Sequence, residues 1–302
     1  MTASLKRLNI YFKEMYPIIP RLILGGLLFF EIYFIVLLNH GVTAFDLGAG
    51  ELVGAFTVFS FLCWLRIADD FKDYELDCRL FAHRPLPSGR TKKSDLAVFI
   101  TLLIALTLAL NYVFMNNFVF CIILYTYGSL MAIWFFQKHK IQKSLPLALL
   151  THNPVQIIMN IYIISFVVIK YSIKPFDLTN CLAVMTLYFP ALIWEVSRKI
   201  RAPKDETEYV TYSKLFGYKK SVDFVFIMTW VDIVTNFILV WNLNKLSVIA
   251  LLINVIWMSA KFIEFKKDPT VFKLVDKVEK YTYIQESLMI LTVATYLAGV
   301  RI

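Results

Sequence analysis

The chain has 302 residues, of which 59% are hydrophobic and only 18% are charged, and its mean hydropathy is +0.65. This composition excludes an ordinary soluble domain and indicates a polytopic membrane protein. The net charge of +9 comes from bases that cluster between apolar segments, which is typical of membrane topology. No aromatic-basic stripe or zinc-ligand spacing accompanies them, so we expect no nucleic-acid partner. The four cysteines are scattered without a CxxC and predict no disulfide framework.

A basic, amphipathic stretch over residues 1–16 comes first, and we expect it to lie at the membrane interface. No small-residue cleavage site follows the first apolar run, which is therefore expected to be an uncleaved span. Nine apolar segments have about the length that a bilayer requires. Since backbone groups find no water partner in lipid, the nine segments predict helices and one all-α membrane domain over residues 1–302. The segments are expected at 19–39, 48–68, 95–114, 117–137, 147–169, 178–197, 221–241, 245–264 and 281–300.

The distribution of bases orients these segments. Of the 31 Lys and Arg residues, 26 lie before the first segment or in the loops after the even-numbered segments. The opposite side has only Lys170, Lys174, Lys245 and Arg301. Because cytoplasmic loops carry an excess of Lys and Arg, we expect a cytoplasmic N-terminus and an external C-terminus.

The end of the second segment is rich in acids. Asp69, Asp73 and Asp77 recur every fourth residue, so on a helix they share one face, and Asp70 and Glu75 lie nearby. So many carboxylates beside hydrocarbon are costly unless cations share the site. Oxygen-only ligands at this density suit a hard divalent cation such as Mg²⁺. The alternative is an acidic helix end that is solvated in the cytoplasm.

The loop after these acids is rich in bases, which are Arg79, Arg84, Arg90, Lys92 and Lys93. Acids that hold a metal ion beside bases that hold an anion indicate a metal–diphosphate site. The sixth segment ends in a similar way, in a charged extension and a basic loop over residues 195–217. Four spans separate the two stretches. This organisation suggests two related four-helix units and a ninth helix, with the two charged ends forming one pocket mouth.

At these two stretches the chain resembles the UbiA superfamily of intramembrane prenyltransferases. The first family signature is Asn-x-x-x-Asp-x-x-x-Asp, which here is Asp69-x-x-x-Asp73-x-x-x-Asp77 with Asp70 in its usual place. The RPLPSG sequence of residues 84–89 closely matches the loop that follows in the family. Nine spans and a cytoplasmic N-terminus also agree with the family, so the resemblance covers nearly the whole chain.

The resemblance implies a prenyl diphosphate donor, Mg²⁺ as cofactor and an aromatic or lipid acceptor. Departure of the diphosphate builds negative charge on its oxygens and leaves an allylic carbocation, from which water must be excluded. The implied metal ligands are Asp69, Asp70, Asp73, Asp77, Glu195 and Asp205. The implied catalytic residues are Asp69, Asp73, Asp77, Glu195 and Lys199. The bases expected to bind the diphosphate are Arg66, Arg84, Arg90, Lys138 and Arg198.

The second signature departs from the family pattern. Members carry Asp-x-x-x-Asp there, whereas this chain has Glu195-x-x-x-Lys199 followed by Asp205 and Glu206. Glu195 can still ligate a metal ion. Lys199 cannot; it either binds diphosphate oxygens in place of one metal charge, or it extends with Arg198 from the helix end toward water.

Polar residues also occur inside the spans. Thr151-His152-Asn153-Pro154 opens the fifth segment, where the proline kinks the helix and frees a carbonyl. We expect Asn153 to bind the acceptor or line the groove, with helix–helix hydrogen bonding as the alternative. Four further polar residues in the spans require a partner that the sequence does not identify: Glu31, Asp232, Gln285 and Glu286.

The sequence therefore predicts an intramembrane prenyltransferase that moves a prenyl group from its diphosphate to an acceptor. Two other functions use the same scaffold. A UbiA-type terpene cyclase or diphosphate lyase shares the metal site but quenches the cation internally or with water. A non-catalytic lipid-binding or transport protein releases no diphosphate from any donor.

Overall fold

The computed structural model describes residues 3–207 and 209–299, and the regular elements in this part of the chain are helices. Arg301, one of the four external bases, and the end of the ninth predicted segment lie outside it. The all-helical prediction is confirmed. The helices divide into two compact units, and α2 contributes its first part to one and its second part to the other.

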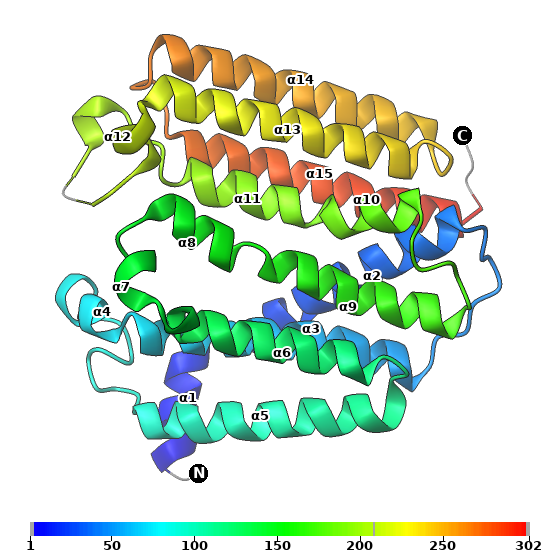
Figure 1. Cartoon of the computed structure of the whole chain (residues 1–302), viewed down its shortest axis with the longest axis horizontal. Helices are drawn as coiled ribbons and strands as arrows, with labels where there is room; N and C mark the ends of the chain where they lie inside the picture. The colour runs from blue at the N-terminus through cyan, green and yellow to red at the C-terminus, as the bar shows by residue number, and fades with distance from the viewer. Residues whose placement is uncertain (1–2, 208, 300–302) are drawn as a thin grey trace. The chain divides into compact units, whose positions relative to one another are not determined.

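The first unit consists of the residues up to Phe30, Phe45–Lys138 and Ile169–Tyr171. Within it, α3 packs against α5 and α6 (Figure 1). Its elements are α1 (Ala3–Glu14), the start of α2 (Ile18–Asn39), α3 (Ala49–Lys72), α4 (Tyr74–Leu80), α5 (Lys93–Phe114), α6 (Phe118–Ala132) and the 3-10 turn η1 (Trp134–Phe136).

The second unit contains the end of α2 and most of the chain after Lys138. Here α13 packs against α10, α11 and α14, and α15 packs against α11 and α14. Its other elements are α7 (Lys138–Ile141), α8 (Leu145–His152), α9 (Val155–Lys170), α10 (Leu178–Thr186), α11 (Tyr188–Ser197), η2 (Pro203–Asp205), α12 (Tyr212–Phe216), α13 (Tyr218–Val240), α14 (Lys245–Lys267) and α15 (Leu274–Leu297).

Within the described residues, each of the nine predicted apolar segments lies mostly in helices, and seven of these are long and apolar enough to cross a membrane. Two of these seven candidate spans each consist of two consecutive helices, α8 with α9 and α10 with α11. Helix α6 is apolar but has only 15 residues, and α15 carries charged residues in its first turns and Glu286 further along. The chain is thus an integral multi-pass membrane protein, and the count of nine spans stays a prediction.

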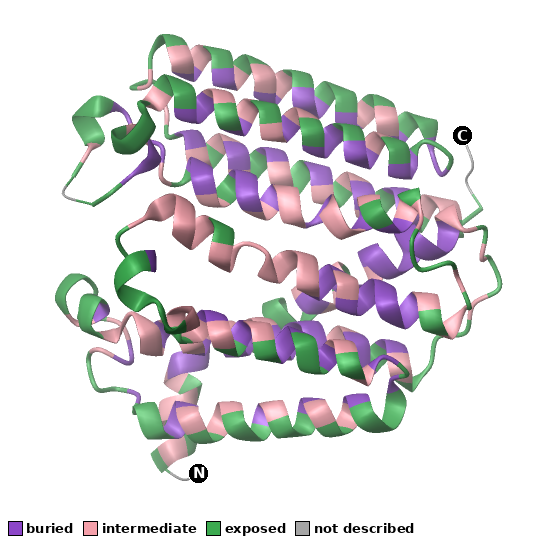
Figure 2. Cartoon of the chain, in the orientation of Figure 1, coloured by how far each residue is buried: buried purple, intermediate pink, exposed green. Residues whose placement is uncertain are grey.

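Apolar side chains cover one side of several long helices, where Figure 2 shows rows of exposed residues on α5, α13 and α14. Water would make such rows costly, whereas lipid tails solvate them at no cost. The rows on α5 and α14 include Val98, Leu102, Leu106, Leu246, Ile249, Ile253 and Ile256.

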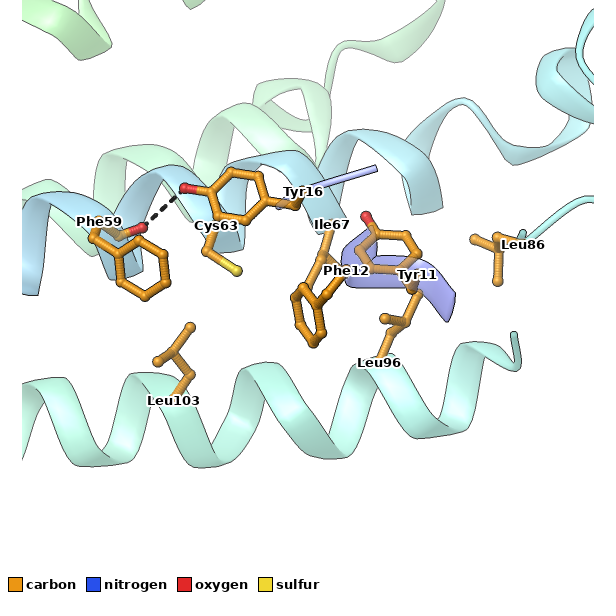
Figure 3. Packing of buried hydrophobic residues seen from close by; sticks show 9 residues of the cluster. All are labelled: Tyr11, Phe12, Tyr16, Phe59, Cys63, Ile67, Leu86, Leu96 and Leu103. Carbon is orange, nitrogen blue, oxygen red and sulfur yellow. Dashed lines mark hydrogen bonds between the residues drawn. The ribbon is translucent and has the colours of Figure 1, made fainter. Parts of the chain in front are cut away.

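Helix α1 packs within the first unit through two buried aromatic residues, and its place at the membrane interface stays a prediction. Tyr11 and Phe12 join a cluster with residues of α3 and α5, such as Ile67 and Leu96 (Figure 3). Leu86, from the RPLPSG loop, is 5% exposed and belongs to the same cluster. The cluster therefore fixes that loop beside the end of α3, where the acids lie.

Two glycines allow α2 and α3 to approach closely within the first unit. A Cβ on Gly25 would lie 2.8 Å from the backbone nitrogen of Phe59, and a Cβ on Gly54 would lie 2.2 Å from the Phe29 ring. Small residues let membrane helices pack with their backbones close together. This contact holds the helix that leads into the acids.

Three helices are interrupted, and two of the breaks have a visible cause in the sequence. Pro154 lacks an N–H and separates α8 from α9, as the sequence predicts. Pro190 lies in the first turn of α11, where a missing N–H is tolerated, just after α10 ends. The third break, at Asp73, separates α3 from α4 and falls within the predicted site.

Candidate functional site

The first acidic stretch runs across the break between α3 and α4. Asp73 ends one helix and begins the next, with φ −101° and ψ 10°. The expected single helix is therefore interrupted at its middle acid. Helical hydrogen bonds nevertheless continue through the break, from the Asp73 N–H to the Asp69 carbonyl and from the Asp77 N–H to the Asp73 carbonyl, both at 2.9 Å. The three acids thus keep a spacing of one turn.

Asp70 is held by protein groups on both carboxylate oxygens. The Tyr11 hydroxyl donates a 2.5 Å hydrogen bond to one oxygen, and the Arg66 guanidinium lies 2.8 Å from the other. Burial, and then the Asp70 carboxylate, raise the pKa of Tyr11, so its hydroxyl stays a donor. Arg66, which was expected to bind the diphosphate, therefore pairs with Asp70 four residues later on the same helix face.

Tyr11→Phe is expected to lower the free energy of unfolding by about 1.5–3 kcal/mol, the usual contribution of a hydrogen bond to a charged group. Tyr16→Phe is the matched control, because its hydroxyl donates to the neutral Phe59 carbonyl at 3.2 Å in the same cluster (Figure 3). Thermal unfolding in detergent checks both variants. Equal losses for the two would show that the bond to Asp70 has no special importance.

Asp77 pairs with a base of the RPLPSG loop. Its carboxylate lies 2.8 Å from a guanidinium nitrogen of Arg84, which also stacks 4.0 Å over the Phe81 ring. Further along, Arg90 forms two hydrogen bonds to Glu14, at 2.5 and 2.9 Å. Two of the bases expected to bind diphosphate thus hold acids and fix the loop.

Asp73 differs from these paired acids, because no hydrogen bond or ion pair reaches its carboxylate within the described residues. Burial raises its pKa, Lys72 lowers it, and Asp69, Asp77 and Asp70 raise it further. Asp69 is the more accessible neighbour, with a side chain 48% exposed and Lys72 at 3.5 Å. Crowded oxygen donors of this kind fit a hard cation such as Mg²⁺.

The side chains described do not form a complete metal cage. No group of three His, Cys, Asp or Glu residues in the described part of the chain is arranged to hold a metal ion. Asp70 is already paired with Arg66, and Asp77 is already paired with Arg84. Asp73, which has no partner among the described residues, and Asp69, which Lys72 approaches at 3.5 Å, are thus the predicted ligands of this stretch most open to a cation. Water or diphosphate oxygens would complete an octahedron.

Nothing in the sequence indicated the aromatic turn η1. Trp134, Phe135 and Phe136 have φ values of 57°, 48° and 59°, a left-handed conformation that costs about 1–2 kcal/mol per residue. The Lys72 ammonium lies 4.0 Å from the centre of the Trp134 ring. Such strain concentrates at functional sites. The predicted diphosphate ligand Lys138 follows at the start of α7 and is exposed.

The second stretch, at the end of α11, contains its own compensating charges. Arg198 donates to Glu195 at 2.5 and 2.9 Å, and the Lys199 ammonium lies 2.9 Å from the same carboxylate. The Lys199 side chain is only 11% exposed, so it does not extend into water. Two bases thus share Glu195. Asp205 is exposed on η2, and no ion pair joins it to this group within the described residues.

Tyr212 on α12 is a neighbour of this stretch that the sequence did not indicate. Its N–H donates to the Lys199 carbonyl at 2.9 Å, and its hydroxyl donates to the Leu145 carbonyl at 3.3 Å. Burial, then the Glu195 carboxylate, raise the pKa of Tyr212 to about 12, while Arg198 lowers it. The returning loop therefore packs against the charged end of α11.

Asn153 lies at the break between α8 and α9. Its amide nitrogen is buried and has no hydrogen-bond partner within the described residues. Asn160, one helix further along, instead donates to the Val184 carbonyl at 2.7 Å and accepts from Gln156 at 3.2 Å. Helix–helix bonding thus accounts for Asn160, whereas Asn153 retains a free donor at a broken helix.

Asp232, an acid inside the spans of the second unit, is paired with other polar groups. Its carboxylate accepts from Gln285 at 2.8 Å and from Asn236 at 3.2 Å. Glu31 and Glu286 lie close to one another in the same unit. One Glu31 oxygen and both Glu286 oxygens are nevertheless buried without a hydrogen-bond partner within the described residues. The structure thus identifies partners for Asp232 and Gln285 that the sequence did not indicate.

Comparisons with known proteins show the fold. No model of a known protein family matches the chain, and no curated protein matches it. A solved structure of digeranylgeranylglyceryl phosphate synthase in membranes is similar, with a TM-score of 0.55 and 19% sequence identity. The similarity covers 97% of this chain and 98% of that one. At this level of identity the similarity shows a shared fold, in agreement with the predicted all-helical membrane fold.

Proposed function

We propose that the protein is a Mg²⁺-dependent intramembrane prenyltransferase, which moves a prenyl group from a prenyl diphosphate to an aromatic or lipid acceptor. The observation that carries the proposal is Asp73. Its partly buried carboxylate lies among Asp69, Asp70 and Asp77 without a hydrogen bond or ion pair in the described chain. A carboxylate in this position gains most from a bound cation.

The residues around Asp73 have separable tasks in this proposal. Asp69 and Asp73 would hold Mg²⁺, which supplies Lewis-acid stabilisation of the leaving diphosphate oxygens. Arg84 keeps Asp77 in place, and Arg66 keeps Asp70 in place. Lys138, an exposed base without an ion pair in the described chain, is available to bind the diphosphate directly.

The second stretch would add positive charge in place of a carboxylate. Lys199 and Arg198 together exceed the charge of Glu195 by one. A cation fixed on the protein can stabilise a leaving anion as a metal ion does. Glu195 then orients the two bases, and it becomes a metal ligand only if they release it.

Product analysis tests the proposal. The purified protein is incubated with C10 to C20 prenyl diphosphates and Mg²⁺, with and without a lipid extract of the native membrane, and the products are identified by mass spectrometry. A prenylated adduct that requires the extract supports the transferase. A cyclised hydrocarbon or a free alcohol formed without extract would indicate a cyclase or lyase. No diphosphate release under either condition would favour a lipid-binding protein.

Asn153→Ala is expected to raise the acceptor KM by about tenfold and to leave the donor KM unchanged, since one hydrogen bond contributes about 0.5–1.5 kcal/mol. Its unpaired amide nitrogen makes it the candidate for contact with the acceptor. Asn160→Ala is the control, because it removes a helix–helix bond and should lower stability instead. Steady-state kinetics with the identified acceptor separate the two effects. Parallel increases in both KM values for Asn153→Ala would contradict the assignment.

A further inference from the structure

A basic cavity of about 590 Å³ lies in the second unit beside the start of α15. Three segments of the unit line it, which are the loop between α11 and η2, the connection after α14, and the first residues of α15. Its charged lining residues are four bases and one acid: Arg198, Arg201, Lys204, Lys273 and Asp205. The excess of bases indicates an anionic ligand.

Acids nearby compensate only part of this charge. Glu195 holds Arg198 at 2.5 Å. Lys204 is close enough to Asp268 to lower the pKa of that carboxyl, although hydrogen bonds from Thr270 lower it more. Asp205 adds one negative charge to the lining itself.

Two lining bases remain without an acid partner in the described part of the chain. The Arg201 guanidinium donates only to the neutral Thr207 hydroxyl, at 3.2 Å, and lies 6.0 Å from the centre of the Tyr209 ring. Within the described residues, the Lys273 side chain takes part in no ion pair or hydrogen bond. Both are therefore available to a ligand.

The start of α15 adds an electrostatic reason for an anion at this position. Lys273 is the N-cap residue and provides no side-chain cap, and Leu274 and Val275 line the cavity. Their N–H groups belong to the first turn, where a helix offers free donors and the positive end of its dipole. The positive charge of Lys273 lies beside the positive end of the helix dipole, which is unfavourable. An anion bound between the two would be attracted to both.

Apolar residues form the remaining wall, namely Ile200, Phe265 and Phe272 among others. The ammonium groups of Lys261 and Lys277 lie 5.8 and 5.5 Å from the centre of the Phe272 ring. The basic side of the cavity suits a phosphoryl group, and the apolar side suits an adjoining apolar part of the same ligand.

We propose that this cavity binds a phosphoryl anion, a phosphate monoester or diester, through Arg201, Lys273 and the N-terminus of α15. The phosphoryl group belongs either to a membrane phospholipid or to a soluble phosphorylated compound. Binding requires neither Mg²⁺ nor a prenyl donor. Its test is therefore independent of prenyl transfer. Arg198 and Asp205, which line this cavity, are also among the residues predicted for the prenyl-transfer site.

Binding measurements on the purified full-length chain, without Mg²⁺ or donor, test the proposal. One arm measures inorganic phosphate by titration calorimetry. The other counts phosphatidylglycerol against phosphatidylcholine adducts by native mass spectrometry. Lys273→Ala and Arg201→Ala are each expected to weaken binding by about tenfold, because each removes a charge-assisted hydrogen bond. Lys267→Ala is the matched control, since Lys267 is an exposed base at the end of α14 that does not line the cavity.

Binding of phosphatidylglycerol alone, weakened in Lys273→Ala and Arg201→Ala, would support the site and identify a lipid headgroup. Binding of phosphate, weakened in the same way, would support the site and identify a soluble ligand. Binding of neither probe, or equal binding by all three variants and the unchanged protein, would overturn the proposal. Unaltered thermal unfolding of the variants would show that a loss of binding does not come from misfolding.

Discussion

Asp73→Asn is expected to reduce Mg²⁺-dependent diphosphate release by about 10²- to 10³-fold, the usual effect of losing one preorganised group that stabilises a leaving anion. The amide keeps the shape of the side chain and removes the charge that holds the metal ion. No hydrogen bond or ion pair in the described chain involves the Asp73 carboxylate, so the variant should fold normally. Diphosphate release from a fixed prenyl donor, measured across a Mg²⁺ titration, checks the prediction.

Glu75→Gln is the matched control for this variant. Glu75 is an exposed acid on α4, two residues further along, and lies outside the one-turn spacing of Asp69, Asp73 and Asp77. It should keep full activity. Normal activity of Asp73→Asn would mean that the acids are a solvated helix end, whereas similar losses in both variants would indicate a general effect of negative charge.

Lys199→Met is expected to lower diphosphate release by about 10- to 100-fold at low Mg²⁺, since a hydrogen bond to a charged group contributes about 1.5–3 kcal/mol. The variant leaves Arg198 to neutralise Glu195 and removes the extra positive charge. High Mg²⁺ should restore part of the activity. Lys199→Asp should shift the Mg²⁺ requirement upward, because it recreates the pair of acids found in the family signature. A Mg²⁺ titration of diphosphate release measures both effects.

Lys220→Met is the control for the loss of a lysine, because Lys220 is an exposed base near the start of α13. It should leave the Mg²⁺ dependence unchanged. If Lys199→Met lowers the unfolding temperature but leaves the Mg²⁺ dependence intact, Lys199 has only a structural role in holding Glu195.

Local features of the site were predictable from spacing. The residues i, i+3 and i+4 of a helix are neighbours, which accounts for the contacts of Glu195 with Arg198 and Lys199. The break before α9 follows from Pro154. Long apolar runs predicted the helices themselves, because a bilayer leaves the backbone few alternatives.

Contacts distant in the sequence were not predictable. Tyr11 and Asp70 are 59 positions apart, and only the packing of α1 against α3 brings them together. The same packing buries Tyr11 and Phe12 of α1. The left-handed run at Trp134 has no glycine or asparagine to signal it. The break at Asp73 has no proline or glycine to signal it.

The most direct test of the central claim is diphosphate release by the unmodified protein from C10 to C20 prenyl diphosphates, with Mg²⁺ present and after its removal by a chelator. The account predicts release of diphosphate from at least one donor, its loss on chelation, and its return when Mg²⁺ is added back. Release that persists at the same rate after chelation would contradict the role proposed for Asp69 and Asp73.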